Sequence, residues 1–319
     1  MTKSPLVTHI YTADPSAHVI NGKLYVFPSH DRDIDTIDND NGDQYDMNDY
    51  HVLEMTSPDG PARDLGCVLK VEDIPWASKQ LWAPDAAWVN NQLYFYFPAR
   101  DKDGIFRIGV ATAPSPEGPY TAQPLPISGS FSIDPCSFVD DDGTAYLSFG
   151  GLWGGQLEKW TTGTFQDSAK GPSGASVALS PQIARLKPNM LELAEAPRDL
   201  VIVDEHGNPL LAGDEERRYF EGPWMHKYNG LYYFSYSTGT THKIVYGTSK
   251  SPYGPFTWKG EILPPVLGWT THHSIVEFQG RWWLFYHDCS LSGGINHKRS
   301  VKMAPLNYRA DGSIEMVRP

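Results

Sequence analysis

The sequence has little cysteine and no long apolar run. Its three cysteines, Cys67, Cys136 and Cys289, are scattered over 319 residues without a Cys-x-x-Cys pair. They do not suggest a disulfide framework and fit a reducing compartment, and no cysteine or histidine spacing fits a zinc site. No stretch resembles a signal peptide or reaches the length of a membrane span. We expect a cytoplasmic protein that does not bind membranes, although a chain whose leader had been removed would look the same.

Positive charge is also scarce. The chain has 26 lysines and arginines against 38 aspartates and glutamates, which gives a formal net charge of −12 and a pI near 5.3. Nucleic acids and anionic membranes both require a basic face on the protein that binds them. Neither partner is expected, and a neutral or cationic ligand is favoured.

Long helical periodicity is missing too. Only residues 187–200 could hold a short helix, and Pro188 and Pro197 limit it. What recurs instead is a short alternating apolar run, a turn rich in Asn, Asp, Gln and Gly, and a strongly aromatic run. This pattern, typical of a β-hairpin, occurs at residues 18–27, 87–96, 137–147, 224–234 and 274–284.

A second turn lies between hairpins, with the pattern Ser-Pro-x-Gly-Pro at residues 57–61, 115–119 and 251–255. Proline fixes φ and glycine supplies the left-handed position, so these segments predict turns between outer strands. The hairpin turns lie about 50 to 90 residues apart, which accommodates a four-stranded propeller blade and its loops. We predict that residues 1–319 form one all-β domain, a five-bladed β-propeller, with a β-sandwich as the alternative.

An ionisable residue precedes every hairpin, in order Asp14, Asp85, Asp134, Glu221 and His272. Because the innermost strand of each blade lines the central channel, these positions should converge at one end of it. Like charges crowded into a partly dry site destabilise a fold, so function explains the pattern better than structure does. The alternative for an individual Asp-Pro pair is an ordinary turn.

Carboxyl groups in different protonation states are what the hydrolysis of a glycosidic bond needs. A protonated carboxyl donates to the leaving oxygen, while an ionised one deprotonates water or attacks carbon directly. A further carboxylate near the acid raises the pKa of that acid.

In these motifs the chain resembles glycoside hydrolase family 43, a family of five-bladed propeller enzymes. The resemblance covers essentially the whole sequence. It rests on Ala13-Asp14-Pro15, Trp82-Ala-Pro-Asp85, Ile133-Asp134-Pro135, Phe220-Glu221-Gly222-Pro223, His272-His273-Ser274 and the stretch 297–301. It implies an inverting mechanism in which Asp14 is the general base, Glu221 the general acid, and Asp134 the residue that orients Glu221 and raises its pKa. Inversion implies carboxyl groups of Asp14 and Glu221 about 6.5–9.5 Å apart.

The same resemblance implies roles around the acids. His272 is similar to a channel histidine that contacts a hydrated calcium ion, so a structural or activating Ca²⁺ is expected there, although the chemistry requires no cofactor. Arg299 resembles an arginine that binds the sugar being released; the alternative is a surface arginine. Neighbouring strand residues face opposite sides of a sheet, so His273 should point away from the channel.

Sugar faces are apolar and stack on aromatic rings, so aromatic residues near the predicted acids are candidates for substrate contact. These are Trp76, Trp82, Phe131 and Trp153. Packing between blades is the alternative for each of them.

Within the family, the chain looks most similar to the β-xylosidases and α-L-arabinofuranosidases. We predict an exo-acting enzyme that releases xylose from the non-reducing end of β-1,4-xylo-oligosaccharides, with α-L-arabinofuranosidase action on arabinoxylan or arabinan oligosaccharides as the alternative. A retaining, invertase-like propeller typically has Arg-Asp-Pro and Glu-Cys, where this chain has Ile133-Asp134-Pro135 and Glu221-Gly222. A sugar-binding propeller without catalysis is the alternative of another class. The oligomeric state and the roles of Asp85 and of the 31–49 loop are open.

Overall fold

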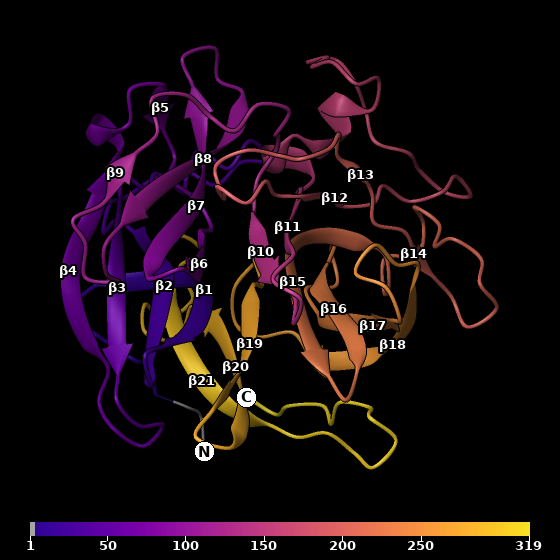
Figure 1. The fold of residues 1–319 in the computed structure, drawn as a ribbon. Helices are drawn as coiled ribbons and strands as arrows, with labels where there is room; N and C mark the ends of the chain where they lie inside the picture. Colours follow the sequence, from indigo (N-terminus) through magenta and orange to yellow (C-terminus); the bar gives the residue numbers. More distant parts are fainter. Residues whose placement is uncertain (1–3) are drawn as a thin grey trace.

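In a computed structural model, which describes residues 4–319, five β-sheets surround a central axis (Figure 1). The strands nearest to that axis are β1, β6, β10, β15 and β19, one from each sheet (Figure 1). Neighbouring strands pair in antiparallel fashion, except that the short outer strand Ile202–Val203 pairs in parallel with the strand Phe256–Leu263. The prediction of a five-bladed β-propeller is confirmed.

The sheets follow one another along the chain. Blade 1 consists of β1 (Tyr11–Ile20), β2 (Lys23–Asp31), β3 (Asp49–Met55) and β4 (Arg63–Lys70). Blade 2 consists of β5 (Ala77–Lys79), β6 (Asp85–Val89), β7 (Gln92–Asp101), β8 (Phe106–Ala113) and β9 (Thr121–Ala122). Blade 3 consists of β10 (Cys136–Val139), β11 (Ala145–Phe149), β12 (Gln182–Arg185) and β13 (Arg198–Asp199).

Blade 4 consists of β14 (Ile202–Val203), β15 (Tyr219–Tyr228), β16 (Leu231–Thr238), β17 (Ile244–Ser249) and β18 (Phe256–Leu263). Blade 5 has three strands, β19 (His273–Phe278), β20 (Arg281–Asp288) and β21 (Ser300–Leu306). The described helices are single 3₁₀ turns at Val71–Asp73, Trp153–Gly155 and Leu157–Trp160. Residues 187–200 form no helix, and β13 occupies part of that segment. Within residues 4–319 the structure contains no helix with the length and apolar character needed to cross a membrane.

All five predicted hairpins form, and each joins the two innermost strands of its blade. Four of them turn through two residues that both have positive φ, the geometry that fits the twist of the flanking strands. These turns are Asn21-Gly22, Asn90-Asn91, Asn229-Gly230 and Gln279-Gly280. The Ser-Pro-x-Gly-Pro segments connect outer strands, as the sequence predicted: β3 to β4 in blade 1, β8 to β9 in blade 2 and β17 to β18 in blade 4.

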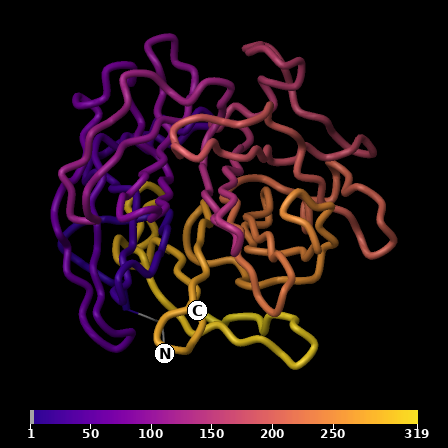
Figure 2. The backbone as a smooth tube through the Cα atoms, viewed as in Figure 1, coloured from indigo at the N-terminus to yellow at the C-terminus, as the bar shows by residue number. Residues whose placement is uncertain are grey.

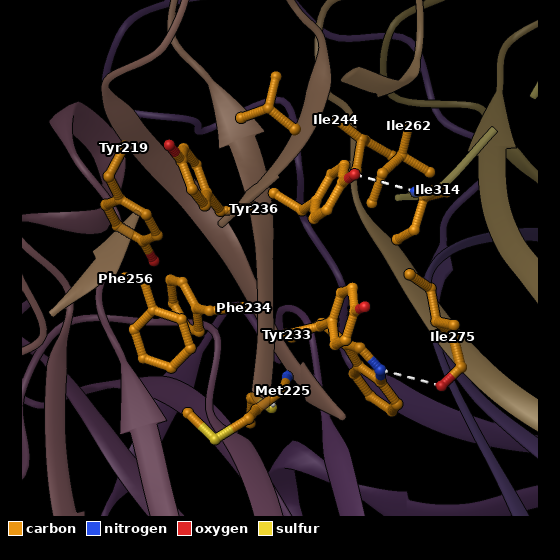
Figure 3. Packing of buried hydrophobic residues seen from close by; sticks show 14 of the residues in the cluster. Tyr219, Met225, Tyr233, Phe234, Tyr236, Ile244, Phe256, Ile262, Ile275 and Ile314 are labelled. Atoms are coloured by element: carbon orange, nitrogen blue, oxygen red, sulfur yellow. Dashed lines mark hydrogen bonds between the residues drawn. The ribbon is translucent and has the colours of Figure 1, made fainter. Parts of the chain in front are cut away.

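Aromatic side chains fill the space within and between the blades. In blade 4 the rings of Tyr233, Phe234 and Tyr236 lie along β16, with Phe256 and Ile275 packed nearby (Figure 3). Burying such side chains contributes roughly 1.5–3 kcal/mol each. The aromatic runs of the hairpins therefore contribute substantially to core packing.

The ring closes where the beginning of the described chain meets blade 5. The backbone N–H of Leu6 donates to the carbonyl of Val301 at 2.8 Å, and that of Thr12 donates to Arg299 at 2.9 Å. The trace in Figure 2 runs once around the axis, so the first and last blades become neighbours. This seam places residues at opposite ends of the sequence beside the same end of the channel.

Candidate active site

A pocket with a cavity volume of about 90 Å³ opens at one end of the channel. Ionisable groups from blades 1, 3, 4 and 5 line it, together with aromatic residues and part of the 31–49 loop. Those named by the sequence prediction are Asp14, Trp82, Asp134, Trp153, Glu221, His272 and Arg299.

Unusual backbone conformations direct the acids into the pocket. Asp14 has φ +48° in a bulge of β1, and Asp134 has φ +56° just before β10. In blade 4 the left-handed residue is Gly222, with φ +65°, which follows Glu221 at a similar bulge of β15. A left-handed aspartate costs about 1–3 kcal/mol, a strain that is concentrated at functional sites in proteins.

Asp14 is held by hydrogen bonds on both carboxylate oxygens. Ser29 donates to Oδ2 at 2.6 Å, and Nη1 of Arg299 donates to Oδ1 at 3.0 Å. The backbone N–H of Asp14 donates to Nδ1 of His287, whose Nε2 donates to the carbonyl of Thr270. Burial by itself would raise the pKa of Asp14, but the charge of Arg299 and the bond from Ser29 outweigh it, so the pKa lies below its ordinary value. Asp14 is ionised at neutral pH.

Arg299 is a buried residue with a 2% exposed surface, which excludes the surface alternative. Its guanidinium forms a bidentate pair with Asp31, through Nε and Nη2 at 2.8 Å each, and Asp31 also accepts its backbone N–H. Its carbon Cζ lies 4.8 Å from the centre of the Tyr45 ring. The geometry makes Arg299 the residue that orients the carboxylate of Asp14 and lowers its pKa.

Glu221, which is partly buried, and Asp134, which is buried, form a pair of acids. Burial raises the pKa of Glu221 to about 8, assisted by the negative charge of Asp14. Burial and the charges of Glu221 and Asp14 also raise the pKa of Asp134. The Gly222 N–H donates to Asp134 Oδ2 at 2.9 Å, whereas no donor in the described part of the chain bonds to the Glu221 carboxyl. The pair therefore retains a proton at neutral pH, and the hydrogen bond to Asp134 favours placing it on Glu221.

His272 faces the pocket, whereas His273 faces blade 4, where its Nε2 is 2.6 Å from the Ser235 hydroxyl. Both ring nitrogens of His272 are buried without a hydrogen-bond partner among residues 4–319, and Nε2 is 4.0 Å from Asp134 Oδ2. Burial lowers the pKa of His272, so the ring is neutral and offers a lone pair. A hydrated cation fits these observations, because an orphaned imidazole beside several carboxylates gains both a ligand and a counter-charge from it.

Asp85 does not line the pocket, which corrects the expectation that all five pre-hairpin residues gather there. Its carboxylate accepts hydrogen bonds from Ser16 and His18 of blade 1 and from the backbone and hydroxyl of Ser137 of blade 3. Asp85 thus joins three neighbouring blades, and its role is structural.

The aromatic predictions divide in two. Trp82 and Trp153 line the pocket, and Trp153 stacks on Trp269 with ring centres 5.9 Å apart. Trp76 does not line it, because its indole stacks on Phe97 in the core of blades 1 and 2. Phe131 is also outside and packs against Phe149 and Trp160.

Several pocket residues were not predicted from the sequence. Asp31, Tyr45, Trp269 and His287 support or line the site, yet none precedes a hairpin turn. Tyr45 belongs to the long loop whose role was open. The only available signal was the length of that loop, since long ordered loops frequently carry function.

This arrangement can perform acid–base chemistry on a bound ligand. One carboxylate is ionised and held by an arginine, and a second carboxyl with a raised pKa lies in the same pocket. Such a pair can take a proton from water and give a proton to a leaving oxygen.

Residues 63–314 match the model of a family described as Glycosyl hydrolases family 43. Xylosidase/arabinosidase 43A of Humicola insolens is 62% identical over 99% of this chain and 99% of its own length. A β-xylosidase of Xylanibacter ruminicola is 49% identical over 97% of each chain.

Solved structures agree with this match. A family 43 β-xylosidase/α-arabinofuranosidase from a compost microbial metagenome, in complex with xylotriose and in a calcium-free form, is 57% identical. It superposes with a TM-score of 0.98 over 99% of this chain and 97% of that chain. A Xanthomonas citri family 43 enzyme in complex with xylose is 56% identical, with a TM-score of 0.95 over 99% and 93%.

Proposed function

Because the chain belongs to glycosyl hydrolase family 43, we propose that it is an exo-acting, inverting β-1,4-xylosidase that also releases L-arabinofuranose. The observation that carries the proposal is the opposite direction of two pKa shifts in one pocket. The pKa of Asp14 is lowered by Arg299, and that of Glu221 is raised by burial to about 8. Relatives with more than half of their residues identical are xylosidase/arabinosidases, and two of the similar structures hold xylotriose or xylose.

In the proposed mechanism, Glu221 donates its proton to the glycosidic oxygen as the bond to the anomeric carbon breaks. A water on the opposite face of the sugar attacks that carbon while Asp14 accepts its proton. This single displacement inverts the anomeric centre and requires the two carboxyl groups to lie about 6.5–9.5 Å apart. Asp134, whose Oδ2 accepts the Gly222 N–H, orients Glu221 in this proposal, and its charge, where it is ionised, delays the ionisation of Glu221.

The walls of the pocket support the exo-acting assignment. The 31–49 loop supplies one wall, including Tyr45 and Met47, and the stacked pair Trp153 and Trp269 supplies another. Walls on two sides enclose the sugar that enters the pocket, which favours the end of a chain over its middle, and an indole offers a surface for the apolar face of that sugar. We propose that Trp153 and Trp269 contact the substrate.

The proposed specificity is tested with nitrophenyl glycosides and with xylo- and arabino-oligosaccharides. We expect turnover of nitrophenyl β-xyloside and α-L-arabinofuranoside, and stepwise release of xylose from xylotriose. Product analysis by chromatography distinguishes the modes of action, because an endo-acting enzyme would first produce oligosaccharides from a longer xylan fragment. Binding of xylotriose without any turnover would identify a sugar-binding propeller and overturn the proposal.

The stereochemical outcome is a separate prediction. Proton NMR recorded during early turnover of a β-linked xylo-oligosaccharide should show α-xylose first, before mutarotation produces the β anomer. Initial appearance of β-xylose would require a double displacement and would exclude Asp14 as a general base.

We also propose that His272 contacts a hydrated Ca²⁺ ion in the channel. The relative solved in a calcium-free form supports this proposal, as do the two unpartnered nitrogens of His272. The cation would supply positive charge beside the crowded carboxylates. Chelation is expected to lower the melting temperature by a few degrees, and added Ca²⁺ to restore it. A His272→Ala variant should lose that response; an unchanged melting curve and no metal in the purified protein would contradict the site.

A further inference from the structure

A group of side chains of the types that bind metal ions lies outside the channel, on blade 1. His30 is the penultimate residue of β2, Asp49 and His51 are the first and third residues of β3, and one donor atom from each lies within 4.8 Å of the others. Nδ1 of His30 is 2.6 Å from Asp49 Oδ1, and Nε2 of His51 is 3.9 Å from Asp49 Oδ2. We propose that these three side chains bind a Zn²⁺ ion, with water as the fourth ligand.

The orientation of His51 supports the proposal. Its Nδ1 lies 3.0 Å from Asp64 Oδ1, and Asp64 also accepts the backbone N–H of Gly66. A carboxylate that accepts the Nδ1 proton leaves Nε2 of the ring as a free lone pair directed toward Asp49. This relay of carboxylate, imidazole and metal is the usual support of zinc-binding histidines.

The donor chemistry selects the class of metal. Two imidazoles and one carboxylate suit Zn²⁺, whereas Ca²⁺ and Mg²⁺ prefer oxygen ligands. Cys67 pairs with His51 across β3 and β4, so a thiol borders the group as well. The side chains of His30, Asp49 and His51 are 19%, 24% and 14% exposed, which is open enough for an ion to enter from solvent.

The position of the group gives the metal a structural task. His30 and Asp49 lie at the two ends of the 31–49 loop, where it leaves β2 and enters β3. This loop forms one wall of the pocket. The next residue after His30 is Asp31, which holds Arg299. A metal that joins β2 to β3 here would clamp the base of that wall without entering the pocket. The sequence did not predict this site because the donors come from two strands separated by the loop.

The proposal is tested on the full-length, metal-free protein with excess Ca²⁺ present, so that the channel is saturated. Titration calorimetry with ZnCl₂ should show one Zn²⁺ per chain, and a 100-fold excess over Kd should raise the melting temperature by about 4 °C. His51→Gln and Asp49→Asn should each weaken Zn²⁺ binding by at least about 100-fold, and Asp64→Asn by about 10- to 100-fold. Melting curves without metal establish that each variant is folded.

Two controls make the result specific. His206→Gln alters an exposed histidine away from the group and should leave Zn²⁺ affinity unchanged, and His272→Ala should do the same. Equal Zn²⁺ binding by wild type and His51→Gln, or no binding by wild type, would overturn the proposal. His30→Gln is the second ligand variant, so the test survives if one substitution fails to fold.

Discussion

Replacement of Glu221 by Gln is expected to lower kcat for unactivated xylobiose by about 10²- to 10⁴-fold, because the leaving sugar then departs without a proton. Gln keeps the shape of the side chain and cannot ionise. The loss should be much smaller for a nitrophenyl glycoside, whose leaving group is stable as an anion. Steady-state kinetics on both substrates measure this contrast directly.

Glu158→Gln is the matched control for Glu221→Gln. Glu158 is another buried carboxyl with a pKa raised by burial, and it accepts the backbone N–H of Trp153 beside the pocket. Its replacement should leave the contrast between the two substrates unchanged. Equal losses on both substrates in the Glu221 variant would point to a binding defect and remove Glu221 from the acid role.

The Glu221→Gln variant should also be more stable than the wild type. The folded-state pKa of Glu221 is raised to about 8 from 4.5, so ionisation costs the folded state stability as pH rises between these values. At pH 7 the free energy of unfolding of the variant should exceed that of the wild type by on the order of 3 kcal/mol, which corresponds to several degrees in melting temperature.

In the wild type, kcat should fall as pH rises through about 8, where Glu221 loses its proton. A rising limb at that pH would contradict the assignment.

Asp14→Asn is expected to lower kcat by about 10²- to 10⁴-fold for every substrate in the panel, including the nitrophenyl glycosides, because water still has to be deprotonated. The variant should remain folded, since the Asn oxygen can accept from Arg299 while its NH₂ group donates to the Ser29 hydroxyl. The uniform loss distinguishes the base from the acid. Kinetics on the same two substrates check the prediction.

A secondary effect ties Asp14 to Glu221. The charge of Asp14 contributes to the raised pKa of Glu221, so its removal should lower that pKa and shift the alkaline limb of the residual activity to lower pH. Ser29→Ala is the control, since it removes one hydrogen bond to Asp14 and leaves the charge. It should cost far less activity and leave the alkaline limb in place. An unchanged limb in Asp14→Asn would show that the two carboxyls do not interact.

The hairpins were predictable because their turn chemistry is local. Asn21-Gly22 and Gln279-Gly280 specify a two-residue turn whatever the rest of the chain does, and the aromatic run that follows specifies the buried strand. The positions of Asp14, Asp134 and Glu221 followed from the hairpins, since each acid precedes its turn by a similar interval. The same hairpin geometry in blades 1, 3 and 4 therefore brings together three side chains that are distant in the sequence.

Residues on long connections were not predictable in this way. Trp76 is near Asp85 in the sequence, but the path of its segment turns the indole into the core, against Phe97. Trp269 lies beside Trp153 only because two loops from different blades meet. Asp31 likewise gains its partner Arg299 from the other end of the chain. Sequence distance carries no information about such contacts, which depend on how the blades pack.

The seam between blades 1 and 5 has a consequence for the order of biosynthesis. A ribosome delivers Asp14 among the earliest residues of this sequence and Arg299 among the last, and their hydrogen bond lies directly beside the Thr12–Arg299 closure. The nascent polypeptide thus carries Asp14, the proposed general base, without the cation that lowers its pKa until Arg299 has also been synthesised. Hydrolytic competence arrives with the final blade, so truncated translation products are expected to be inert even where their early blades have folded.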